Sequence, residues 1–193
     1  MWGDYRGAQR QVYLFKPLTT LLILGLALLP PVVTVPPYQG LIVVGLLFSL
    51  AGDVFLMLPQ DRFIAGLVSF LLAHLCYIAA FVRDIGFQLH LISLIPFLLY
   101  AIVLVGYLWP HLGKLRGPVL IYALAILLMG WQAAARWLDL GNAPALWAAI
   151  GAIFFLISDS ALAINRFARP FTQAQGVVLS TYFLAQWLIA LSV

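Results

Sequence analysis

Long hydrophobic runs, each about as long as a bilayer-spanning helix, dominate the pattern along this chain. A spanning helix needs about 20 mostly apolar residues. Short segments with Pro, Gly and charged residues separate the runs, as in LPQDR and LWPHLGKLRGP, which is typical of turns between helices. Seven spans are predicted, at 17–35, 38–58, 63–82, 89–108, 118–136, 144–164 and 174–192. Pro30 and Pro31 are expected to end or kink the first span.

The composition strengthens this interpretation. Of the 193 residues, 65% are hydrophobic and 8% are charged, whereas an ordinary soluble domain is about a quarter charged. We therefore predict an all-α polytopic membrane protein that forms a single transmembrane bundle over residues 1–193. The first ten residues lack the apolar core and cleavage site of a signal peptide. The single cysteine, Cys76, excludes an intrachain disulfide.

Positive charges divide unequally between the two predicted sides of the membrane. The net charge of +4 is modest, and we expect it to lie in loops as a topology signal rather than to bind nucleic acid. The richer side holds Arg6, Arg10, Lys16, Arg62, Lys114, Arg116, Arg166 and Arg169, and the other holds Arg83 and Arg136. The richer side is predicted to be cytoplasmic, with the C-terminus on the opposite side.

Two stretches of the chain resemble each other. FSLAGDVFLML (48–58) and FFLISDSALAI (154–164) share Phe-x-Leu-x-small-Asp, and Arg-Phe follows each. The next predicted helix carries FLLAH in one copy and YFLAQ in the other, and KPLTTLLILGLALL weakly echoes GPVLIYALAILLMG. Because both copies run in the same direction, they predict a parallel repeat of four helices, with halves of about 1–86 and 87–193.

A repeat of this kind predicts eight helices, and the hydrophobic pattern shows seven. We therefore expect a 4+4 parallel-repeat fold in which this chain lacks the first helix, the one that would precede Lys16. The alternative is that short apolar strings match by chance in a leucine-rich chain.

Two acids lie inside predicted spans. Asp53 is six residues before Pro59, and Asp159 is seven before Arg166, which places each about 9–10 Å inside the cytoplasmic end of its helix. An Asp near the centre of a spanning helix costs roughly 2.5–3.5 kcal/mol on insertion scales, so both should face the bundle interior. Spacing puts Gly45, Ser49 and Gly52 on the face of Asp53; Gly66, Phe70, His74 and Tyr77 share another face, and Tyr182 and Gln186 a third.

The paired acids point to acid/base chemistry. Two carboxyls in a low-dielectric cavity cannot both ionise cheaply, which predicts a protonated acid beside a carboxylate. His74, nearer mid-membrane at about 18 Å, could orient a carboxyl, shuttle a proton or ligate a metal. The alternative is that the acids form structural hydrogen bonds. The further polar residues predicted near the site are Ser49, Tyr77, Ser158, Asn165, Tyr182 and Gln186. With no serine-nucleophile, P-loop or Cys/His motif, we expect neither cofactor nor metal.

These motifs also resemble a known family. SLAGDVFLML with DRFIAGLVSFLLAHLCYIAAF, then GAIFFLISDSALAINRF with STYFLAQWLIA, is similar over nearly the whole chain to the YhhN-like lysoplasmalogenase family. The resemblance implies hydrolysis of the vinyl ether bond of lysoplasmalogens to a fatty aldehyde and glycerophosphoethanolamine or glycerophosphocholine. Asp53 and Asp159 would divide the acid and base roles, in an order that the sequence leaves open.

The three cations at the cytoplasmic boundary, Lys16, Arg62 and Arg166, have two interpretations. They are either topology charges or ligands of a lipid phosphate. The main rival function is a transporter or lipid-translocating protein that uses the Asp pair as a proton relay, and a third is a non-catalytic lipid-binding or sensing protein. The expected partners are a lysophospholipid, membrane lipids and water, in a bacterial inner membrane. The oligomeric state stays open.

Overall fold

A computed structural model describes residues 6–29, 36–58, 60 and 62–193, and only the backbone of 6–12 and 36. Within that part of the chain the secondary structure is entirely helical, which confirms the all-α prediction. The helices are α1 (Arg6–Ala27), α2 (Pro36–Met57), α3 (Phe63–Ile85), α4 (Leu91–Leu108), α5 (Arg116–Leu140), α6 (Ala143–Ala163) and α7 (Ala174–Ala190). The short elements are the 3₁₀ helices η1 (Trp109–His111) and η2 (Gly113–Leu115) and the π-helix η3 (Ile164–Ala168).

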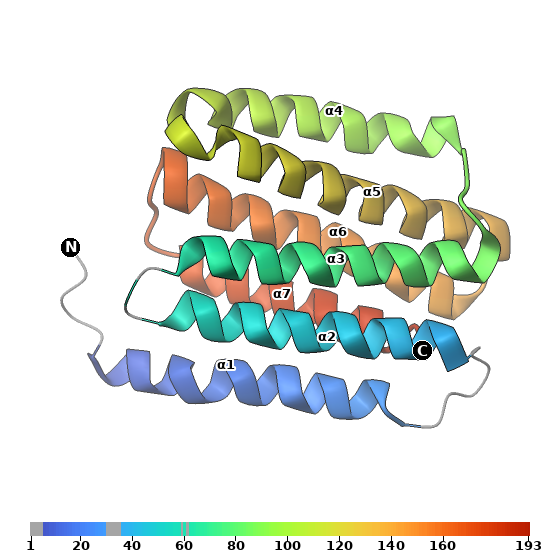
Figure 1. Cartoon of the computed structure of the whole chain (residues 1–193), viewed down its shortest axis with the longest axis horizontal. Helices are drawn as coiled ribbons and strands as arrows, with labels where there is room; N and C mark the ends of the chain where they lie inside the picture. The colour runs from blue at the N-terminus through green and yellow to red at the C-terminus, as the bar shows by residue number, and fades with distance from the viewer. Residues whose placement is uncertain (1–5, 30–35, 59, 61) are drawn as a thin grey trace.

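The bundle is that of a polytopic membrane protein. Within the described residues, five segments are long and apolar enough to cross a membrane: Pro37–Met57, Phe63–Ile85, Leu91–His111, Gly113–Leu140 and Ala143–Ala168. Two apolar helices, Tyr13–Ala27 and Ala174–Ala190, are shorter, so a full set of seven crossings stays a prediction. Successive helices alternate in direction, and the loops after α2, α4 and α6 gather at the end where α1 begins (Figure 1). We call this end the loop end of the bundle.

The first predicted span, 17–35, has the wrong extent. α1 begins at Arg6, carries Pro17 inside it and ends at Ala27, before the two prolines. Hydropathy reports which residues suit the membrane core, whereas a helix can continue through polar residues on either side of it. The part of the predicted span at 30–35 lies outside the described residues, as do the side chains of Arg6 and Arg10.

The prediction that the charges lie in loops is wrong for most of them, because six lie within helices: Arg6, Arg10 and Lys16 in α1, Arg83 in α3, and Arg116 and Arg136 in α5. Arg136 is only 3% exposed. Its Nε donates to Asp84 at 2.7 Å, and its guanidinium lies 4.6 Å from the centre of the Tyr38 ring. A carboxylate and an aromatic face together compensate a cation for lost water, which is why this one can be buried.

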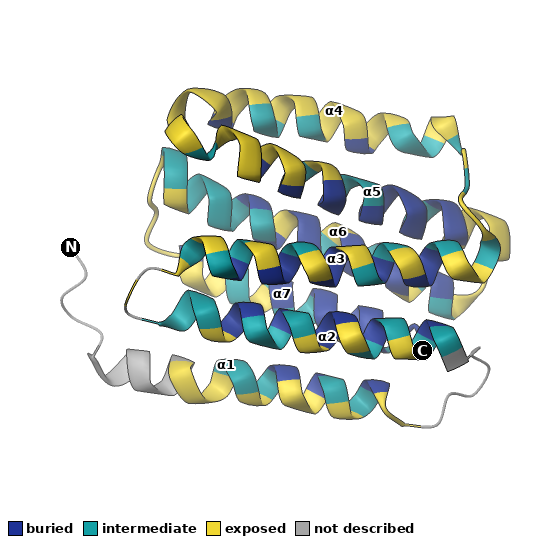
Figure 2. Ribbon diagram, viewed as in Figure 1, coloured by how far each residue is buried: buried dark blue, intermediate teal, exposed yellow. Residues whose placement is uncertain are grey.

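Small residues let α2 and α3 approach closely. A Cβ on Gly45 would lie 2.3 Å from the Tyr77 ring, and one on Gly52 would lie 2.7 Å from the Phe70 ring. The predicted inward face of α3 is confirmed, since Gly66, Phe70, His74 and Tyr77 are all buried. Figure 2 shows exposed residues gathered on α4 and on the outward faces, with buried residues between the helices. The polar residues of the site therefore lie inside the bundle.

Candidate active site

Asp53 is wholly buried on α2 and is held by three side chains from two other helices. From α1, Lys16 places its Nζ 3.1 Å from Asp53 Oδ1, and Thr20 donates its hydroxyl to Oδ2 at 2.7 Å. From α7, the Tyr182 hydroxyl donates to the same Oδ2 at 2.9 Å. The ammonium neutralises the acid inside the bundle, and charge-assisted hydrogen bonds of this kind are strong. We call these four residues the Asp53 cluster.

Asp159 on α6 has a different set of neighbours. The Tyr122 hydroxyl on α5 donates a hydrogen bond to Asp159 Oδ2. Beside it, the Ser160 hydroxyl accepts from the Tyr100 hydroxyl at 2.8 Å and donates to the Leu156 carbonyl at 2.6 Å. Among the described residues, no Lys or Arg forms an ion pair with Asp159. We call Asp159 and Tyr122 the Asp159 cluster.

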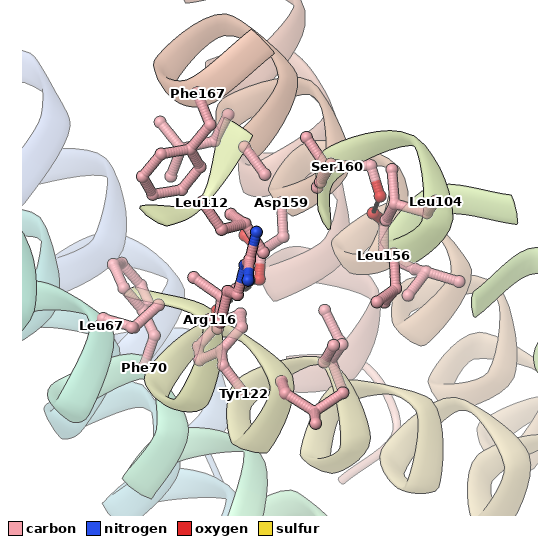
Figure 3. Close-up of a pocket in the computed structure, with 18 of the residues that line it drawn as sticks. Leu67, Phe70, Leu104, Leu112, Arg116, Tyr122, Leu156, Asp159, Ser160 and Phe167 are labelled. Carbon is pink, nitrogen blue, oxygen red and sulfur yellow. Dashed lines mark hydrogen bonds between the residues drawn. The ribbon is translucent and has the colours of Figure 1, made fainter. Parts of the chain in front are cut away.

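Asp159 also lines a cavity that Asp53 does not reach. The cavity has a volume of about 70 Å³ and is formed by α2 to α6 together with η1 and η3 (Figure 3). Because one water needs roughly 10–15 Å³ by this measure, the space suits several waters or part of an acyl chain. Its walls are mainly apolar, and the polar side chains on them are Asp159, Tyr122, Ser160 and Arg116. The lining residues place it at the loop end of the bundle.

Aromatic rings separate the two clusters. His74 is fully buried on α3, with ring centroids 5.1 Å from Tyr122 and 4.6 Å from Phe155, both edge-on. Phe155 in turn contacts the Tyr182 ring at 5.6 Å. Neither nitrogen of His74 makes a hydrogen bond to any described residue, and His74 does not line the cavity. Its position therefore suits holding Tyr122 in place better than touching a ligand.

Of the other predicted residues inside the bundle, Tyr77, Gln186 and Ser158 link helices. The Tyr77 hydroxyl donates to Gln186 Oε1 at 2.7 Å and so links α3 to α7. Ser158 donates to the Val178 carbonyl at 3.0 Å, while Ser49 is fully buried on α2. None of these residues lines the cavity described above.

The predicted residues at the loop end also lie outside the cavity lining. Asn165 Oδ1 accepts the backbone N–H of Phe171 at 3.2 Å and braces the turn after η3. Arg62 is exposed and donates to Gln60 at 3.3 Å, and the Arg166 guanidinium lies 5.0 Å from the Phe63 ring centre.

Four site residues escaped the sequence prediction: Thr20, Tyr122, Ser160 and Arg116. Thr20 lies four residues after Lys16, hence on the same helix face, and that spacing could have identified it. Tyr122 lies in the segment that weakly echoes the helix of Lys16 and Thr20, so the predicted repeat could have identified it. No sequence pattern marked Ser160 as a site residue. Arg116 was interpreted only as a topology charge.

The described part of the chain does not assemble a metal centre. Among the described residues, no group of three or more His, Cys, Asp or Glu side chains is placed to hold a metal ion. His74, Asp53 and Asp159 therefore do not form a ligand set, because aromatic rings lie between the two clusters.

Comparison with known proteins gives a consistent result. The model of the YhhN family matches residues 11–193. The membrane protein YhhN of Escherichia coli O157:H7 is 31% identical over 190 residues, covering 98% of this chain and 90% of its own length. Human lysoplasmalogenase TMEM86A is 37% identical over 164 residues, covering 81% and 66%. A Mycobacterium tuberculosis protein named lysoplasmalogenase is 35% identical over 134 residues, covering 65% and 49%. No solved structure gives a significant match.

Proposed function

We propose that this chain, which belongs to the YhhN family, hydrolyses the vinyl ether bond of lysoplasmalogens within the membrane. The products would be a fatty aldehyde and a glycerophospho-alcohol. Relatives named lysoplasmalogenase support this activity. The observation that carries the proposal is the position of Asp159, a carboxyl on the wall of an apolar cavity inside a membrane protein. Such a cavity suits an acyl chain, and the acid supplies a proton beside it.

We assign the first proton transfer to Asp159. The β-carbon of a vinyl ether is electron-rich, so the C=C electrons take the carboxyl proton there and leave an oxocarbenium ion on the α-carbon and ether oxygen. Asp159 is suited to begin as the neutral acid, because its one described hydrogen-bonding neighbour is a phenol and its surroundings are apolar. Once it has given up the proton, the Tyr122 hydroxyl stabilises the carboxylate.

Water then completes the hydrolysis. A water molecule adds through its oxygen to the α-carbon, and the Asp159 carboxylate takes one of the water's protons. The resulting hemiacetal collapses: the bond from the α-carbon to the glycerol oxygen breaks, the hydroxyl becomes the aldehyde carbonyl, and its proton passes to the leaving oxygen. One water is consumed and Asp159 ends protonated as it began, so one carboxyl serves as acid and then as base.

We assign Asp53 a supporting role as the charged acid of the pair. Its contacts with Lys16, Thr20 and Tyr182 suit an ionised carboxylate that need not change its charge. His74 would act through Tyr122, by fixing the ring that hydrogen-bonds Asp159.

The packing of the helices supports a repeat with halves 1–86 and 87–193. If α1, α2 and α3 correspond to α5, α6 and α7, each half places one Asp on its middle helix and a partner for that Asp on its first helix. The pairing of α3 with α5 then matches that of α7 with α1. On this interpretation the two carboxyl sites began alike and diverged through Lys16 and Thr20 in one half and Tyr122 in the other.

The test is aldehyde release from lysoplasmenylethanolamine by the purified protein, compared with an Asp159→Asn variant of equal thermal stability. We expect aldehyde from the wild type and background levels from the variant. Turnover by the variant at the wild-type rate would exclude Asp159 as the acid. If the wild type releases no aldehyde but moves lysolipid between vesicle leaflets, the lipid-translocating alternative replaces the enzyme.

A further inference from the structure

We infer that Arg116 binds the phosphate of the lysolipid substrate at the edge of the cavity that holds Asp159. This inference rests on the proposed function and names the part of the substrate that the cavity recognises. Arg116 begins α5, is exposed, and lines the same cavity as Asp159. Figure 3 shows both side chains directed to this space from two different helices.

The Arg116 side chain is anchored but retains free donors. Its Nε donates to the Trp109 carbonyl at 3.3 Å, and its guanidinium lies 5.0 Å from the centre of the Trp109 ring. A guanidinium has five N–H donors in a planar fork, and in the described structure the contact to Trp109 uses only the Nε donor. The two terminal nitrogens can therefore form the paired hydrogen bonds that suit a phosphate.

The three cations that the sequence analysis named as possible phosphate ligands contact other residues and do not line the cavity. Lys16 is neutralised by Asp53, Arg62 contacts Gln60, and Arg166 lies over the Phe63 ring. Among the described Lys and Arg residues, Arg116 alone lines the cavity, and no described carboxylate forms an ion pair with it. A phosphate that binds beside this cavity would thus meet an uncompensated positive charge.

The shape of a lysoplasmalogen matches this arrangement. Only a glycerol backbone separates its vinyl ether oxygen from its phosphate, so the two groups must bind near each other. Asp159 and Arg116 line the same cavity and could meet these two groups. The fatty chain then has the apolar wall formed by residues such as Leu67, Leu104, Leu108 and Leu156. Trp109, 42% exposed beside Arg116, is a residue type that favours the membrane interface where headgroups lie.

The experiment compares two substrates with the same vinyl ether. One is lysoplasmenylethanolamine, and the other is the matching alkenylglycerol, which has no phosphate. Purified wild type, Arg116→Gln, Arg116→Lys and Lys114→Gln are assayed for aldehyde release in the same detergent micelles. Lys114 lies two residues away and outside the cavity lining, so its variant controls for loss of one positive charge at this end of the bundle.

The measured quantity is the ratio of kcat/KM for the phosphate-bearing substrate to kcat/KM for the alkenylglycerol. In Arg116→Gln this ratio should fall roughly 10-fold to 100-fold through a higher KM, as expected for loss of a charged hydrogen-bonding partner. Arg116→Lys should recover part of it, because a lysine keeps the charge without the fork. Lys114→Gln should keep the wild-type ratio.

Two results would overturn the inference. If Arg116→Gln lowers the turnover of both substrates equally, Arg116 supports the fold or anchors the protein to membrane lipid rather than binding the substrate phosphate. If the ratio stays at the wild-type value, Arg116 does not contact the substrate. If the wild-type protein releases aldehyde from neither substrate, the result contradicts the proposed function instead.

Discussion

Asp53 and Asp159 occupy similar sequence motifs, yet the structure surrounds them differently. Asp53 has an ammonium and two hydroxyls around it and does not line the cavity, whereas Asp159 has one phenol and lines the cavity. A buried carboxyl that is fully compensated is poorly suited to exchange protons, and one in an apolar cavity is well suited to it. In the proposed mechanism, the neighbours of each Asp, rather than its sequence motif, determine its chemical role.

The largest expected effect separates Asp159 from an acid outside the site. Asp159→Asn should lower kcat for aldehyde release by about 10²–10⁴-fold, the usual contribution of a general acid or base. Asparagine keeps the shape and can still accept from Tyr122, so the thermal midpoint should change little. Asp139→Asn is the matched control, since Asp139 is exposed near the C-terminal end of α5 and pairs with His90. Equal loss in both variants would contradict the role of Asp159.

The next effect is on stability and belongs to the Asp53 cluster. Lys16→Met should destabilise the protein by roughly 3–5 kcal/mol, because removing one partner of a buried ion pair leaves a charge uncompensated. The double variant Lys16→Met/Asp53→Asn should lose less stability than the sum of the losses in the two single variants, because the two residues interact directly. Unfolding in detergent measures all three variants. Strict additivity would show that the Lys16–Asp53 contact contributes nothing.

Smaller effects are expected from the two tyrosines that donate hydrogen bonds to the acids. Tyr122→Phe should lower kcat up to about tenfold, since it removes a hydrogen bond worth roughly 0.5–1.5 kcal/mol from the reacting carboxyl. Tyr182→Phe removes a hydroxyl from Asp53, so it should act mainly on stability. Steady-state kinetics and thermal unfolding on the same preparations check both. The reverse pattern would place the reaction at Asp53.

The smallest effect concerns His74. Since neither ring nitrogen has a hydrogen-bond partner among the described residues, His74→Phe removes no hydrogen bond there, and its somewhat larger ring should cost about 1 kcal/mol of stability, the lower end of the range for added volume in a packed core. His74→Ala should lower kcat more than His74→Phe does, because the smaller side chain no longer supports Tyr122. A large loss in His74→Phe, equal to that in His74→Ala, would instead make the imidazole itself a proton carrier.

The sequence predicted the helices well because hydrophobic length and turn residues determine them directly. Each predicted span coincides with one helix, except for the extent of the first. The burial of Asp53, His74 and Tyr182 followed from helix spacing and from the cost of polar groups in lipid. The partners of each acid could not be read in this way. They depend on which helices meet, so Lys16 was interpreted as a boundary charge although it pairs with Asp53, and Tyr122 was not among the predicted site residues.

The central claim is that Asp159 delivers the proton to the vinyl ether β-carbon. Hydrolysis in D₂O, with the aldehyde reduced at once to the alcohol and analysed by mass spectrometry, tests it directly. The account predicts one deuterium on the second carbon of the product from the wild type, and no product above background from Asp159→Asn. Product without deuterium on that carbon, or labelled product formed by Asp159→Asn at the wild-type rate, would contradict it.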